Sequence, residues 1–227
     1  MKQLFLNKIK APYFIFPIII FFYLSVSLDK YFSSEYYDQT LYKHFQKQFL
    51  DQQKLLEQRT ENLLHDIQTG DTSLIFSDNI QELNKLVDDK NMYLFLFHKD
   101  SMLIWPDNRI AEAEILPAII RDNQLIQLAN GWFYAHLKIF KEYKIIGLLL
   151  LKNNYSIQNK YLSNNFNRVF KFPDEINIKP RSLKDKFKII NEKGKPVFSL
   201  DFNKKFLYEG WNRFLVVFCF TISILLL

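Results

Sequence analysis

The chain has 227 residues, of which 48% are hydrophobic, and its formal net charge at pH 7 is +6. Residues 29–210 hold 26 of the 30 basic residues and all 24 acidic ones, which leaves this middle part a net charge of only +2. The absence of any dense Lys/Arg run excludes the concentrated basic surface typical of nucleic-acid binding. The single cysteine, Cys219, lies outside the middle part, which therefore has neither a disulfide nor thiol chemistry.

The first predicted element is a transmembrane helix over residues 11–28, a stretch of 18 residues without a charge or a histidine. A helix of about 20 apolar residues crosses the roughly 30 Å hydrocarbon layer of a bilayer. Residues 1–10 contain no acid, and their basic side chains predict a cytoplasmic N-terminus; these are Lys2, Lys8 and Lys10. The alternative is a signal peptide cleaved near Ser25-Val26-Ser27, but the apolar stretch is long, contains two prolines and continues into a helical pattern.

A long membrane-proximal helix is predicted for residues 30–68, which contain no glycine and no proline. Apolar residues recur there at spacings of four and seven, which place them on one helical face; they are Tyr37, Leu41, Phe45, Phe49, Leu56, Leu63 and Ile67. Gly70-Asp71 ends the helix. Two interpretations of this face are open. The helix either packs on its own domain or pairs with a second copy through Phe45, Phe49 and Leu56.

Residues 91–202 are predicted to form a mostly antiparallel sheet, after a short helix at residues 79–88. The expected strands are residues 93–97, 102–105, 124–127, 132–140, 143–151, 186–190 and 196–202. The stretch 143–151 is apolar on both faces, which predicts a central, covered strand. Together these elements predict an α+β fold with a domain at residues 29–210.

A second apolar segment covers residues 211–227 and is free of charge after Arg213. Its charge-free part is too short to cross a bilayer alone, but Trp211 supplies an interfacial anchor. We interpret the segment as the start of a second transmembrane helix that is cut short at Leu227. Two such spans predict an inner-membrane protein whose middle domain is periplasmic.

Candidate ligand-binding residues follow from alternation along residues 132–140. Every second side chain of a strand points to the same face, so Phe133, Ala135, Leu137 and Ile139 are expected in the core. The opposite face is then aromatic and polar, and it is either a solvated surface or one wall of a small-molecule pocket; it carries Trp132, Tyr134, His136 and Lys138. Trp105, Asp107 and Arg109 are candidates for the opposite wall.

Catalytic and metal-binding patterns are not apparent in the sequence. The four histidines are far apart, and the five glycines form no phosphate-binding loop. His65-Asp66-Ile67-Gln68-Thr69 is similar to the phosphoacceptor box of histidine kinases, but Gly70 replaces the proline and the segment lies between the two spans. We therefore treat this similarity as coincidental, and expect no catalytic residue, cofactor or metal within residues 1–227.

Several segments are similar in amino-acid sequence to members of a known family. They are residues 130–133 (Asn-Gly-Trp-Phe), 143–149, 152–155 (Lys-Asn-Asn-Tyr) and 161–166. With the order of anchor, long helix, mixed domain and second span, the chain resembles the input half of sensor histidine kinases from Bacteroidetes. The resemblance implies a Cache- or PAS-like sensor domain that responds to a small molecule or an envelope signal, and a homodimer. It also implies a missing cytoplasmic kinase core that uses ATP and magnesium and phosphorylates a response regulator.

Two other classes of function stay open at this stage. The same input half is compatible with a chemoreceptor or a cyclic-dinucleotide enzyme, because a fold does not determine a function. A non-signalling envelope assembly protein, anchored at both ends and binding another protein through its middle domain, has the same layout.

Overall fold

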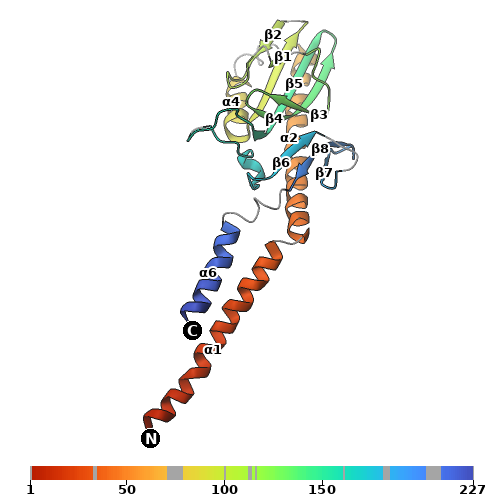
Figure 1. Ribbon diagram of the computed structural model, residues 1–227. Helices are drawn as coiled ribbons and strands as arrows, with labels where there is room; N and C mark the ends of the chain where they lie inside the picture. Colours follow the sequence, from red (N-terminus) through yellow and green to blue (C-terminus); the bar gives the residue numbers. More distant parts are fainter. Residues whose placement is uncertain are drawn as a thin grey trace. The chain divides into compact units, whose positions relative to one another are not determined.

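The computed structural model describes residues 2–32, 35–70, 79–99, 101–111, 114–115, 117–160, 162–180, 185–202 and 211–226, with side chains for all of these except residues 2–14, 79–80 and 211–212. The chain divides into two compact units, Met1–Leu41 with Phe202–Leu227, and Tyr42–Asp201. The boundary falls inside one long helix, α2 (Glu35–Thr69), whose first residues belong to the first unit (Figure 1).

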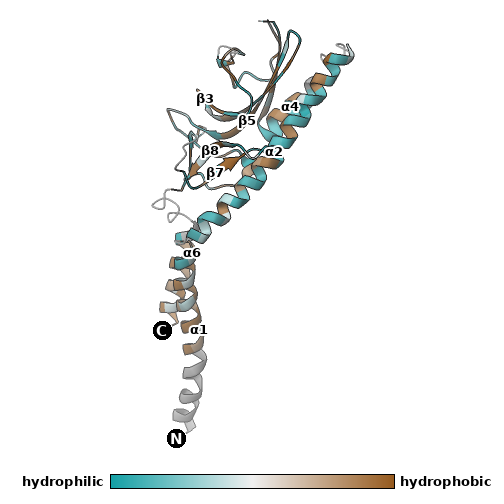
Figure 2. Ribbon diagram, turned by 90° about the vertical axis from the view of Figure 1, so that its right-hand side faces the viewer, coloured by the Kyte–Doolittle hydropathy of each residue, from teal (hydrophilic) through white to brown (hydrophobic). Residues whose placement is uncertain are grey.

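The first unit is built on two apolar helices, α1 (Lys2–Phe32) and α6 (Trp211–Leu225), that lie side by side and run antiparallel. The Ser25 hydroxyl of α1 donates to the Val216 carbonyl of α6 at 3.0 Å, and the rings of Phe22 and Phe220 are 6.2 Å apart. The stretch Ile15–Phe32 is long and apolar enough to cross a membrane, and only 6% of it is buried. Figure 2 shows the hydrophobic colouring of both helices. The N-terminal part of the chain is thus compatible with a membrane protein.

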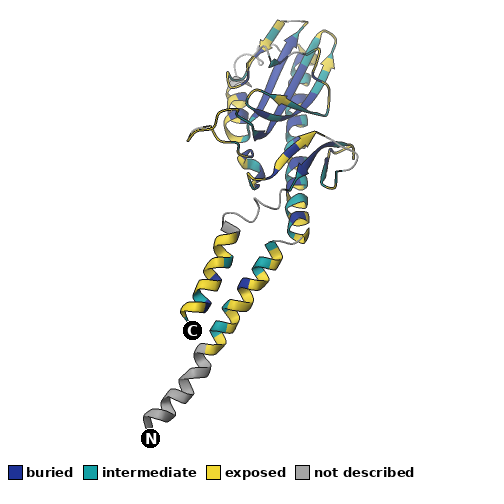
Figure 3. Ribbon diagram, viewed as in Figure 1, coloured by how far each residue is buried: buried dark blue, intermediate teal, exposed yellow. Residues whose placement is uncertain are grey.

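The second unit contains an antiparallel five-stranded sheet in the order β2-β1-β5-β4-β3. Its strands are β1 (Met92–His98), β2 (Ser101–Ile104), β3 (Gln124–Leu128), β4 (Gly131–Phe140) and β5 (Tyr143–Asn153). The predicted α+β class is confirmed, and so is the central, covered position of β5, whose middle residues are all buried (Figure 3). A further helix, α4 (Asn79–Lys90), leads into β1 and contacts α2 through the Arg59–Glu82 ion pair.

Helix α2 covers one face of this sheet. Gly147 of β5 marks a close approach, because a Cβ built there would lie 2.9 Å from a methyl group of Leu56 and 3.2 Å from the Thr60 hydroxyl. Cross-strand neighbours of Gly147 are Leu94 on β1 and His136 on β4, so these side chains face the helix as well. The absence of a side chain at Gly147 therefore sets how near α2 lies to the sheet.

The opposite face of the sheet carries the main apolar core. Tyr93, Phe95, Phe133, Ala135 and Leu148 are buried there. Residues from α4 and from the connection between β2 and β3 close the core from outside, among them Val87, Ile110, Ile115 and Ile120. The sheet is thus covered on both faces, in agreement with the apolar character of β5 on both sides.

A second, three-stranded sheet has the order β6-β8-β7, with β6 (Asn177–Pro180), β7 (Lys188–Ile190) and β8 (Pro196–Asp201). Helix α2 is tied to its edge strand β7 by polar side chains. The Gln46 amide donates to the Ile190 carbonyl and accepts from the Ile190 N–H, both at 2.8 Å, and the Tyr42 hydroxyl donates to the Lys188 carbonyl. These bonds satisfy backbone groups at the edge of the sheet.

Two sequence-based predictions need correction. Ile139 was expected in the core with Phe133 and Ala135, but it is 62% exposed, because it lies near the end of β4 where the covering elements have ended. The proposed dimer seam of Phe45, Phe49 and Leu56 is fully buried inside its own domain. The structure thus supports the interpretation in which the helix packs on its own sheet, and this face of α2 is not available to a second copy.

Candidate functional site

The six candidate ligand-binding residues do not share one pocket. Tyr134 and His136 lie on the sheet face that α2 covers, and their exposed fractions are 0% and 3%. Arg109 lies on the other side, near Tyr93 of the apolar core. Trp105 is half exposed and donates from its indole to the Ile110 carbonyl at 3.2 Å, whereas Trp132 is only partly buried. The expected pair of facing walls is therefore absent, because the sheet separates Tyr134 and His136 from Arg109.

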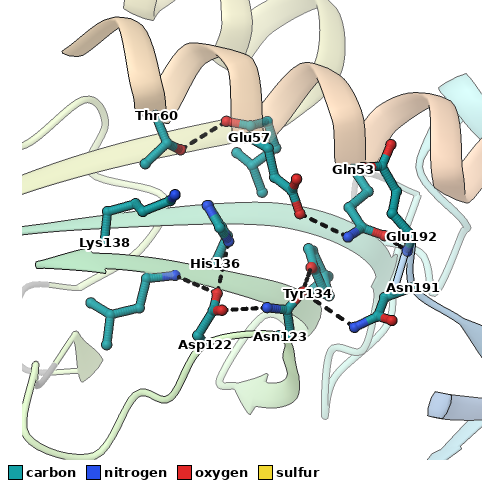
Figure 4. A network of polar contacts seen from close by, with 12 residues as sticks. Gln53, Glu57, Thr60, Asp122, Asn123, Tyr134, His136, Lys138, Asn191 and Glu192 are labelled. Carbon is teal, nitrogen blue, oxygen red and sulfur yellow. Dashed lines mark hydrogen bonds and ion pairs between the residues drawn. The ribbon is translucent and has the colours of Figure 1, made fainter. Parts of the chain in front are cut away.

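Tyr134 and His136 belong to a partly buried polar network that joins β4, the residues before β3, α2 and the turn after β7 (Figure 4). His136 Nδ1 lies 2.7 Å from Asp122 Oδ1, and the Tyr134 hydroxyl donates to the Asn123 amide oxygen at 2.5 Å. Asn123 in turn accepts from the Asn191 amide at 3.4 Å. Among the residues described, His136 Nε2 has no hydrogen-bond partner although it is buried.

The Gln53 side chain connects the network to α2. Its amide oxygen accepts from the Glu192 N–H at 3.3 Å, and its amide nitrogen donates to the Glu57 carboxylate at 2.8 Å. Burial, reinforced by nearby carboxylates, raises the pKa of Tyr134 far above its ordinary value, so the phenol stays neutral. Partial burial acts to raise the pKa of Asp122, but hydrogen bonds from His136 and the Leu137 N–H outweigh it and lower that pKa. The network fixes the helix on the sheet, with Tyr134 and His136 buried within it.

A separate polar cleft of about 590 Å³ includes Arg109. It lies at the end of β5, between the start of β1 and the segment that follows β5. Its volume is within the range of small-molecule sites, about 300–1,000 Å³. Most of its lining is hydrophilic: Asp88, Asn91, Arg109, Asn153, Tyr155, Ser163, Asn165, Asn167, Arg168, Lys171 and Asp174. Of the six candidate residues, only Arg109 lines this cleft.

Two carboxylates hold the Arg109 guanidinium in place. Its Nη2 lies 2.8 Å from Asp88, and its Nε lies 3.0 Å from Asp107, which also accepts from the Arg109 N–H at 2.6 Å. Burial acts to lower the pKa of Arg109, but the hydrogen bonds to Asp88 and Asp107 and the neighbouring Tyr93 raise it overall. Burial raises the pKa of Tyr93 to about 12. Arg109 is therefore a fixed, permanent cation at the rim of the cleft.

Buried polar side chains hold together the segments that form the cleft. The Asn167 amide donates to the carbonyls of Lys90 and Leu150 at 2.7 and 2.9 Å, which joins α4 to β5. The buried ammonium of Lys152 donates to the carbonyls of Asp174 and Ile176 at 2.7 and 2.6 Å. Burial lowers the pKa of Lys152, against the opposing effect of Asp174 and Glu175. Lys152 and Asn167 thus shape the cleft and are already satisfied by the protein.

The segment 166–172 forms one wall of the cleft and has two different sides. Its exposed cations, Arg168 and Lys171, line the cleft together with the edges of Phe166 and Phe172, and all three of its phenylalanines are buried and contact Phe45 of α2. The ring centroid of Phe45 on α2 lies 4.7 Å from those of Phe170 and Phe172, and 5.6 Å from that of Phe166. A displacement of this wall is therefore a displacement of groups that pack directly on α2.

Within the described residues no group of three or more His, Cys, Asp or Glu side chains is placed to hold a metal ion. Comparison of the chain with protein-family models, with curated proteins and with solved structures finds no match.

Sequence reasoning missed most of the cleft. Its residues come from the end of α4, the connection after β2, the end of β5 and the segment 163–174, and no periodic pattern joins them. One signal was present, because Asn153, Tyr155 and Asn165 fall within the segments that resemble sensor regions. Asparagines concentrated in loops after a central strand are candidates for binding, since loops carry function on a rigid scaffold.

Proposed function

We propose that the chain is the ligand-sensing input module of a membrane-bound sensor histidine kinase, with its middle domain in the periplasm and a Cache- or PAS-like role. The observation that carries this proposal is the position of α2. One helix packs on the wall of a polar cleft through Phe45, and its first residues belong to the unit that holds the two apolar helices.

The mechanism we propose is a shift between two arrangements of the domain. A ligand changes their populations only by its different affinity for each of them. Ligand contact with Arg168 and Lys171 biases the position of the segment 166–172, and the ring contacts pass this bias to Phe45 and α2. A movement of α2 relative to α6 is the output, in the manner of a piston or a rotation, and reaches the kinase core of a homodimer. The dimer forms through surfaces other than the buried Phe45 seam.

The proposed topology predicts a clear result with a reporter that is active only in the periplasm. Fused after Asn154, the reporter is expected to be active, because the lysines of residues 1–10 hold the N-terminus in the cytoplasm and α1 carries the chain across. Fused after Lys10, it is expected to be inactive. The opposite pattern would overturn the orientation and would restore His65 as a candidate phosphoacceptor.

The identity of the output is tested by the reading frame downstream of Leu227. A linker helix with an intact phosphoacceptor box, followed by an ATP-binding domain, supports the kinase. A methyl-accepting or nucleotide-cyclising domain would assign the same input module to a chemoreceptor or a cyclic-dinucleotide enzyme. A stop codon shortly after Leu227 would contradict signalling through a cytoplasmic domain and favour an envelope assembly protein.

A further inference from the structure

We infer that the polar cleft binds a small hydrophilic organic acid, with the ligand's carboxylate held by Arg168 and Lys171 and its hydroxyl or amide groups held by asparagines. This inference rests on the proposed sensing function and names the class of ligand. It is based on three properties of the cleft. These are the charged side chains that have an ion-pair partner, the side-chain amides that have a hydrogen-bond partner, and the backbone conformation at Arg168 and Lys171.

The acidic residues of the cleft are engaged, whereas two of its cations are not. Asp88 is paired with Arg109, and an Asp174 oxygen accepts from the Phe166 N–H at 2.7 Å. Arg168 and Lys171 are exposed, and in the part of the chain that the structure describes neither forms an ion pair. Among the described residues, two cations without an ion pair thus stand against one such carboxylate, Asp174, and this net positive charge favours an anion over a cation or a metal ion.

The backbone presents the two cations together. Arg168 begins the short helix η2 (Arg168–Phe170), and Lys171 follows it in a left-handed conformation with φ 45°. The Lys171 N–H donates to the Arg168 carbonyl, and the Asn167 side chain accepts from the Val169 N–H and so caps the turn. Both Arg168 and Lys171 line the cleft, whereas Phe170 between them is fully buried.

The neutral groups of the cleft indicate the rest of the ligand. The amides of Asn91 and Asn167 are occupied by each other and by backbone carbonyls. In contrast, the side-chain amides of Asn153 and Asn165 have no hydrogen bond within the described residues, although both line the cleft. An acid that carries hydroxyl or amide groups satisfies these donors and acceptors, whereas an apolar acid leaves them without partners.

The test is isothermal titration of the full chain in lipid nanodiscs with gluconate, citrate and lactate. Glucose is the uncharged counterpart of gluconate, and sulfate is an anion without hydroxyl groups. At least one of the three acids is expected to bind, and glucose and sulfate are expected not to. The double variant Arg168→Gln/Lys171→Gln should weaken binding by about tenfold or more, because it removes two charge-assisted contacts.

The matched control is Lys99→Gln/Lys141→Gln, which also removes two positive charges but lies at the turns at the other end of β1 and β5. It is expected to bind the acid as the unaltered chain does. The inference is wrong if none of the acids binds, if sulfate or glucose binds as tightly, or if the control loses as much affinity as the cleft variant. If none of the acids binds but the reporter fused after Asn154 is active, only the ligand class is refuted. If the reporter shows the inverted topology, the sensing function itself is refuted.

Discussion

Replacing Phe45 with alanine is expected to lower the free energy of unfolding by about 3–5 kcal/mol, as large-to-small changes of buried aromatic residues do. Phe45 is fully buried, and its ring contacts four other phenylalanines; these are Phe166, Phe170, Phe172 and Phe198. The loss is a large part of a domain's total stability of about 5–15 kcal/mol. Chemical unfolding of the full chain in detergent, followed by tryptophan fluorescence, measures it.

Lys47→Ala is the matched control, because Lys47 is two positions away on the exposed side of the same helix. Its effect should stay within about 0.5 kcal/mol, the usual range for surface substitutions. Cysteine cross-linking separates this expectation from a role of Phe45 between two chains. Efficient cross-linking between copies through a cysteine at position 45, in a Cys219→Ser background, would contradict the burial of this face within one domain.

Tyr134→Ala is expected to lower the free energy of unfolding by a similar amount, about 3–5 kcal/mol. Tyr134 lies on β4, and its side chain is fully buried beneath α2. Its ring packs on Phe49 at a centroid distance of 5.2 Å, and its hydroxyl is bound to Asn123. Thermal unfolding of the unaltered chain and of the variant measures the loss. The reason is packing rather than ligand binding, since the Tyr134 side chain is fully buried.

The conservative variant Tyr134→Phe keeps the ring and removes only the hydroxyl. It should cost about 1–2 kcal/mol, because a buried hydrogen bond is lost and the Asn123 oxygen keeps one longer bond, from Asn191. A Tyr134→Ala variant that unfolds normally but no longer responds to signal would contradict this account. Tyr134 would then be a ligand-binding residue, as alternation along the strand first suggested.

The local elements were predictable because each depends on neighbours in the chain. The charge-free stretch near the N-terminus, the long helix without glycine or proline, and the alternating or continuous apolar strands all carry their own periodicity. The predicted strand at residues 143–151 corresponds to β5, and the predicted helix at residues 79–88 corresponds to α4, within two residues at each end. Strand β6 was missed, because three of its four residues are exposed and it shows no apolar pattern.

Alternation alone established that Tyr134 and His136 share a face, but only the tertiary structure decided what covers it. The covering helix α2 lies about 80 residues earlier in the sequence, and its fit depends on Gly147, a third distant position. The same holds for the cleft, where Arg109 meets Arg168 and Lys171 only after the sheet has formed. Periodicity reports which residues of one element point the same way. The contacts between surfaces depend on packing between distant segments. The sequence of a single element does not determine which other element packs against it.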